Sequence, residues 1–224
     1  MSFAQEIVEL LGEAGDPERA PRMMDYMRGQ FEFYGVSAPS RKAVCKEHFI
    51  ISKHLDHDDL IEQVDLLWQE DARECQHAAV DILIINKKRL LPADMDHLHN
   101  WTVQKSWWDT VDFLASHMVG TLVKKYPQLE KQYIQPWLTS DNMWLNRTCL
   151  IYQLKYAHDT DFEKQKSYIR LLTHDQEFFI QKAIGWSLRQ YSKIEPMLVQ
   201  SFVKEVGLEG LAKREALKYV DTTL

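Results

Sequence analysis

The sequence predicts an all-helical protein, and three features of the 224-residue chain support that fold class. Apolar residues recur with helical spacing through nearly all of the chain after residue 15. Only 8 Gly and 7 Pro are available for turns, which is few for an all-β fold. No segment combines strict apolar–polar alternation with the turn residues of a β-hairpin.

Short breaks divide the chain into successive amphipathic helices of about 10 to 20 residues. We expect the breaks near residues 16–17, 35–40, 55–58, 70–71, 91–93, 126–127, 140–141, 159–161, 174–175 and 195–196. Several of these segments supply a Ser, Asp or Thr at the position of a helix N-cap.

The helices repeat with a period near 35 to 40 residues, which is typical of HEAT-like or TPR-like helix pairs. The turn at 138–144 resembles the turn at 172–178, and His77, Asp112, Arg147 and Lys182 follow one another at intervals of 35. We therefore predict one helical-repeat domain over 1–224, an α-α solenoid whose inner helices line a concave groove. The polar series would face this groove; alternatively, it marks a solvated edge of each helix.

The net charge of −6 is unevenly distributed, with −8 on residues 1–100 and +2 on residues 101–224. A cleft in the second half can therefore be basic, so the composition permits DNA binding without indicating it. Cys45, Cys75 and Cys149 form no CxxC pair, and we expect reduced thiols in a cytoplasmic protein. No apolar run approaches a membrane span, and no motif calls for a metal or another cofactor.

Two stretches of the second half combine tryptophan with charge. Trp108 and Asp112 are four residues apart, so they share one helix face with about 6 Å between their Cβ atoms. Lys182, Trp186 and Arg189 also share a face, at i, i+4 and i+7. On adjacent inner helices these residues would surround one carboxylate with two indoles and several cations, which also include Arg147 and Lys155. Trp107 and Trp144 are expected in the core.

Several segments resemble the AlkD family of HEAT-repeat alkylpurine DNA glycosylases. They are residues 105–112, 144–156 and 177–191, together with 23–27 and 213–216, so the resemblance covers essentially the whole chain. It implies removal of N3- and N7-alkylated purines from double-stranded DNA by a monomeric enzyme without a cofactor. It also implies that the lesion stays stacked in the duplex.

The resemblance assigns roles to individual residues. The catalytic carboxylate of the family corresponds to Asp112, and its two cleft tryptophans correspond to Trp108 and Trp186. Its contacts to the DNA backbone correspond to Tyr26, Arg147, Lys155 and Arg189, and Lys182 joins them from the shared face described above. Some relatives lack an amino-terminal DNA-contacting helix and the activity, but this chain keeps a helical segment through Tyr26.

These residue types suit the cleavage of a glycosidic bond to a cationic base. The alkylated purine already carries positive charge, so it leaves without protonation, and positive charge then develops on the sugar. A carboxylate at ~4 Å stabilises that charge by roughly 4 kcal/mol at an effective dielectric constant near 20. A non-enzymatic repeat module that binds DNA or a protein is the alternative, but such a module has no need for a carboxylate between two indoles.

Overall fold

The computed structural model describes residues 2–220 and is helical throughout, which confirms the all-helical prediction. Within that range there is no β-strand, although one isolated bridge joins Glu32 to Ala72. None of the helices in the described range is long and apolar enough to cross a bilayer. The internal contacts divide the chain into two units, 1–89 and 90–224.

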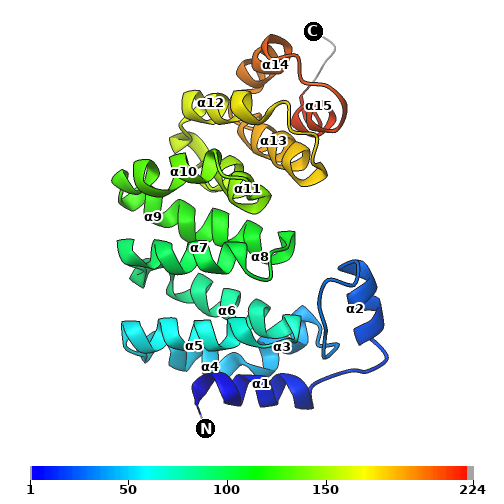
Figure 1. Ribbon diagram of the computed structural model, residues 1–224, viewed down its shortest axis with the longest axis vertical. Helices are drawn as coiled ribbons and strands as arrows, with labels where there is room; N and C mark the ends of the chain where they lie inside the picture. Colours follow the sequence, from blue (N-terminus) through cyan, green and yellow to red (C-terminus); the bar gives the residue numbers. More distant parts are fainter. Residues whose placement is uncertain (1, 221–224) are drawn as a thin grey trace. The chain divides into compact units, whose positions relative to one another are not determined.

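The first unit contains a packed core and one short helix that buries no residue. Its helices are α1 (Phe3–Glu13), α2 (Ala20–Tyr26), α3 (Ala38–Val44), α4 (Lys46–Ile51), α5 (His57–Gln69) and α6 (Arg73–Asn86), with 3-10 turns at Ser52–His54 and Lys87–Arg89. α1 packs on α5 and α6, which also pack on each other (Figure 1). By contrast, α2 contributes no buried residue to this unit.

The segment between α2 and α3 departs from the predicted boundaries, because the helix ends at Tyr26 and not near Gly35. Arg28 and Gly29 have φ values of 56° and 69°, which terminate the helix. The buried carboxylate of Glu74 then accepts the backbone N–H groups of residues 34, 35 and 36 at 3.1, 2.9 and 2.9 Å. A contact 40 residues distant in sequence therefore holds this segment, and local propensity does not reveal it.

The second unit carries the remaining helices. They are α7 (Met95–Val103), α8 (Trp108–Phe113), α9 (Gly120–Lys125), α10 (Gln135–Leu138), α11 (Met143–Ile151), α12 (Phe162–Leu172), α13 (Phe178–Tyr191), α14 (Pro196–Glu205) and α15 (Gly210–Ala216), with π-helical segments at Leu114–Val119 and Glu130–Ile134 and 3-10 turns at Pro92–Asp94 and Ala157–Asp159. α11 packs on α7, α8, α12 and α13, and α13 packs on α15 (Figure 1). α8, the π segment and α9 run on as one helical stretch.

The repeat is visible in a side-chain amide that recurs at the same place in successive helix pairs. The Asn146 amide donates to the carbonyl groups of Trp137, Leu138 and Ser140, at the end of the preceding helix. Gln76 and Gln181, which are 70 residues before and 35 residues after Asn146, bind the preceding turn in the same way. Each amide satisfies carbonyl groups that a helix end leaves without intrahelical partners.

The expected N-caps form at some of the predicted breaks, whereas Asp56, the N-cap residue of α5, makes no side-chain cap hydrogen bond. The side chains of Ser37 and Asp161 accept the backbone N–H groups of Ser40 and Lys164, which lie in the first turns of α3 and α12. Asn142 caps α11 in the same manner. Ser37 and Asp161 therefore mark true helix starts within predicted breaks, whereas the cap of α11 lies one residue after the predicted break at 140–141.

Candidate functional site

A cavity of about 380 Å³ in the second unit brings three helical regions together. Its lining residues are Trp108, Asp112 and Phe113 of α8, Ser116 and His117 of the π segment, Leu154 and Lys155 after α11, and Trp186 and Gln190 of α13. The three residues expected to act in catalysis, Asp112, Trp108 and Trp186, thus line one cavity. Both indoles are half-buried.

A two-pronged ion pair fixes the Asp112 carboxylate at the wall of this cavity. The Arg147 Nε donates to Oδ1 at 2.7 Å, and its Nη2 donates to Oδ2 at 2.8 Å. The two residues are 35 positions apart, one repeat period, on α8 and α11. Parallel hydrogen bonds of this kind fix the plane of the carboxylate as well as its position.

Arg147 is itself held from a third direction, because its Nη1 donates to the carbonyl oxygen of Phe179 at 2.6 Å. Only 4% of Arg147 is exposed, so its guanidinium lies inside the protein and not on the surface. The sequence comparison suggested a contact between Arg147 and the DNA backbone. The structure instead places its donors on Asp112 and Phe179, and a phosphate contact stays a prediction.

Burial governs the titration of Asp112. Loss of hydration raises the pKa of this carboxyl group above the usual range of an aspartate, and the nearby charge of Asp109 acts in the same direction. The hydrogen bonds and positive charge of Arg147 act in the opposite direction, towards a lower pKa. The cavity therefore contains a carboxylate whose charged form depends on one arginine.

The π segment after α8 explains why Ser116 and His117 line the cavity as well. The Ser116 hydroxyl donates to the Asp112 carbonyl at 2.7 Å, and the His117 ring stacks on Phe113 with 5.7 Å between centroids. A π turn widens the helix, so residues four and five positions after Asp112 lie near its face. Sequence reasoning missed both residues, because helical periodicity gives no sign of a π segment.

The expected DNA contacts fall into different environments. Lys155 is exposed at the cavity and makes no ion pair within the described part of the chain. Lys182 and Arg189 both donate to the carboxylate of Glu215 on α15, with Lys182 Nζ 2.7 Å from Oε1. Tyr26 ends α2 in the first unit and is 68% exposed.

Aromatic rings pack beside the ion pair. The rings of Trp107, Trp144 and Phe179 form a cluster with centroid distances of 5.0–5.7 Å, and the Arg147 guanidinium lies 5.9 Å from the Phe179 centroid. Trp107 and Trp144 do not line the cavity, but both are half-buried and do not belong to the fully buried core in which they were expected.

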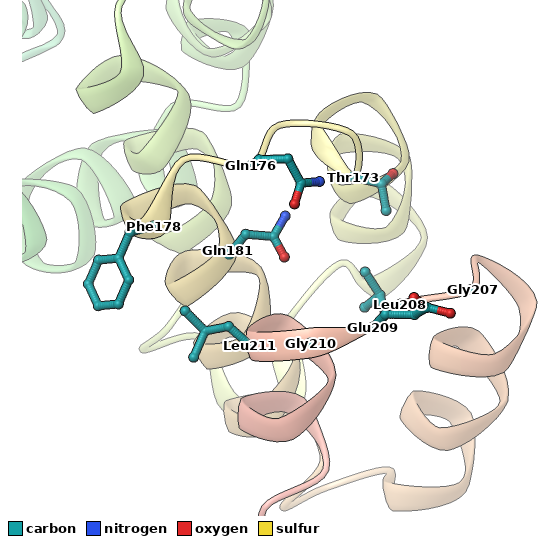
Figure 2. A pocket seen from close by; sticks show the side chains of 9 residues that line it. All are labelled: Thr173, Gln176, Phe178, Gln181, Gly207, Leu208, Glu209, Gly210 and Leu211. Carbon is teal, nitrogen blue, oxygen red and sulfur yellow. The ribbon is translucent and has the colours of Figure 1, made fainter.

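A second cavity of about 520 Å³ lies between the turn before α13 and the turn before α15. Figure 2 shows the amides of Gln176 and Gln181 pointing into the same space, with Phe178 directed away from it. No residue expected to act in catalysis lines this cavity, which is separate from Asp112.

Comparison with known proteins identifies the family of this chain. The family model described as DNA alkylation repair enzyme matches residues 7–220. A solved structure described as a predicted DNA alkylation repair enzyme from Enterococcus faecalis is 34% identical, with a TM-score of 0.87 over 93% of this chain and 98% of that one. No curated protein sequence matches. The all-helical fold and the family match together show that this chain belongs to the DNA alkylation repair enzyme family.

Proposed function

We propose that the protein is a DNA glycosylase that hydrolyses the N-glycosidic bond of cationic N3- and N7-alkylated purines in double-stranded DNA. The observation that carries the proposal is a carboxylate held rigidly at the wall of a cavity between two indoles. Membership of a repair family supports DNA as the substrate. A binding module has no use for a carboxylate there, because a carboxylate repels phosphate.

The leaving group determines which catalytic groups are required. An alkylated purine leaves as a neutral base, so the departing nitrogen needs no proton donor. The sugar that remains has oxocarbenium character and attracts a nearby negative charge. Asp112 supplies that charge and orients the attacking water, while Trp108 and Trp186 hold the sugar and contribute ~0.5–2 kcal/mol each through their ring faces.

The Arg147 partner reduces the field of Asp112 but does not cancel it. A carboxylate ~4 Å from the sugar contributes roughly 4 kcal/mol, and a guanidinium ~8 Å away opposes it by roughly 2 kcal/mol at the same dielectric constant. The net stabilisation is then about 2 kcal/mol, or roughly thirtyfold in rate. Although Arg147 lowers the electrostatic stabilisation of the sugar, it holds the Asp112 carboxylate in one orientation. It also favours the charged form of this carboxylate, which burial disfavours.

The remaining cations serve DNA binding. Lys155, beside the cavity, and Lys182 and Arg189, on the face that carries Trp186, would contact phosphates on either side of the lesion. Tyr26 would contact the DNA backbone from the first unit. We assign Arg147 chiefly to the orientation of Asp112, because it is buried.

Release of free purine from methylated duplex DNA tests this proposal. The purified protein is incubated with the duplex, and the supernatant is assayed for 7-methylguanine and 3-methyladenine. We expect release of both, and no release of uracil from a matched uracil-containing duplex, because uracil needs activation to leave. Absence of free purine, or efficient uracil release, would overturn the proposal.

A further inference from the structure

Glu215 stands between the two cations of α13 that flank Trp186 along the helix. Its Oε1 accepts from the Lys182 Nζ at 2.7 Å, and its Oε2 accepts from the Arg189 Nη1. The Glu215 side chain is 16% exposed, whereas those of Lys182 and Arg189 are 37% and 22% exposed. One carboxylate of α15 therefore links both ends of the α13 face that carries Trp186.

The backbone beneath Glu215 keeps this carboxylate in place. α15 packs directly on α13 (Figure 1). A Cβ placed on Gly185 would clash with the Glu215 Cβ and lie 2.8 Å from the Ala212 carbonyl oxygen. Glycine at 185 thus lets the two helices approach until Glu215 lies over the middle of the cationic face. An incoming phosphate can replace a hydrogen bond of Glu215, but it cannot displace the residue.

Glu215 neutralises only part of the positive charge that Lys182 and Arg189 place on this face of α13. The hydrogen bond from Lys182 lowers the pKa of Glu215, and the charges of Lys182, Arg189 and Lys218 act in the same direction. Glu215 is consequently ionised at neutral pH, and it reduces the charge of the two cations from +2 to +1. Lys182 and Arg189 each keep further N–H donors, because an ammonium has three and a guanidinium has five.

We propose that Glu215 is a positioning and specificity-determining residue, which directs Lys182 and Arg189 to either side of Trp186 and weakens their attraction for undamaged DNA. The inference rests on the proposed function, because it assumes that this face of α13 contacts phosphate. Glu215 would lower affinity for any duplex and favour binding in the one register that places a sugar beside Trp186. Its removal should therefore increase binding to undamaged DNA and slow the chemical step.

The test compares Glu215→Gln with Glu205→Gln, which changes the net charge equally. Glu205 pairs with Arg170 of α12 at 2.6 Å and contacts no residue expected to bind DNA. Affinity for an undamaged duplex is measured over a series of salt concentrations, and base release is measured at saturating methylated duplex under single-turnover conditions. Thermal melts show whether each variant is folded.

For Glu215→Gln we expect several-fold tighter binding to undamaged DNA at low salt, with a salt slope steeper by up to about one. We also expect base release several-fold slower than that of wild type. Glu205→Gln should change neither quantity. A merely structural role for Glu215 predicts a lower melting temperature with an unchanged slope, and that result would overturn the inference. A steeper slope with unchanged base release would overturn its positioning part.

Lys182→Gln separates failure of this inference from failure of the proposed DNA contact. If Lys182→Gln flattens the slope but Glu215→Gln leaves it unchanged, the inference fails and the DNA contact stands. If neither variant changes the slope, this face does not contact phosphate and both fail. A flatter slope for Lys182→Gln with a steeper slope for Glu215→Gln supports both.

Discussion

At the scale of single residues, the ion pair between Asp112 and Arg147 determines what the cavity can do. Neither residue alone would stabilise the positive charge that develops on the sugar. Asp112 without Arg147 would be a partly buried carboxylate that tends to take up a proton, and Arg147 without Asp112 would place a cation beside a developing cation. Together they form an oriented negative group, which is the requirement for stabilising an oxocarbenium-like sugar.

Replacement of Arg147 by lysine should show that geometry matters in addition to charge. Lysine keeps the positive charge but cannot make two parallel hydrogen bonds to Asp112 and a third to Phe179. We expect base release to fall by roughly tenfold or more, equivalent to at least about 1.4 kcal/mol. The same change at Arg170, in the exposed ion pair with Glu205, should leave stability and activity nearly unchanged. Wild-type base release by Arg147→Lys would exclude the orienting role.

The raised pKa of Asp112 predicts the position of the acid limb of activity. The active form is the carboxylate, so kcat/KM should fall as the pH drops through the pKa of Asp112 in the free enzyme. Because burial raises that pKa, the fall should begin above the range of an ordinary aspartate, which titrates near ~3.9. The measurement is base release against pH after subtraction of uncatalysed depurination. An acid limb at or below the ordinary range would contradict this description of the site.

At the scale of helices, close packing of α13 on α15 brings Glu215 to the face that carries Trp186. Gly185 makes the approach possible, since any side chain there would meet Glu215 and the backbone of Ala212. The π segment after α8 also determines which side chains reach the site, because it turns Ser116 and His117 towards the cavity that Asp112 lines.

Gly185→Ala should therefore destabilise the protein. The added methyl group has no space, and overpacking of this kind typically costs about 1–3 kcal/mol, a melting-temperature loss of roughly 2–4 °C for each kcal/mol. Gly12→Ala is the matched control, because a Cβ at Gly12 meets nothing within 4 Å and alanine favours a helix. Thermal melts should rank Gly12→Ala at or above wild type. A Gly185→Ala variant that is as stable as wild type would show that α13 and α15 separate easily.

The sequence predicted the helices better than the contacts between them. Periodicity identified α5, α12 and α13, because each buries one face, and the interval of 35 anticipated the approach of Asp112 to Arg147. It did not predict the loop held by Glu74 or the π segment, since both depend on contacts that periodicity does not encode. Glu215 was also missed, because its role arises from packing against Gly185.

At the scale of the whole molecule, the distribution of charge favours the second unit for contact with DNA. The first unit, residues 1–89, carries a net charge of −6, whereas the second unit, residues 90–224, carries no net charge. Among the predicted DNA contacts of the second unit, Lys155 is exposed without an ion pair in the described range, so it is the cation most available to a phosphate.

Lys155→Gln should weaken duplex binding and flatten its salt dependence by about one counterion. Lys204→Gln is the control, because Lys204 is also an exposed lysine but lies on α14 and does not line the cavity. Binding is titrated from low to moderate salt with undamaged duplex. An unchanged slope for Lys155→Gln would place the phosphate contact elsewhere.

Single-turnover base release by Asp112→Asn tests the central claim most directly. The neutral amide removes the attraction of about 4 kcal/mol for the sugar and leaves the positive charge of Arg147 in place, so release of 7-methylguanine should fall on the order of a thousandfold. Affinity for the damaged duplex should stay near that of wild type. Base release within a few-fold of wild type would contradict the account, because the carboxylate would then have no part in breaking the bond.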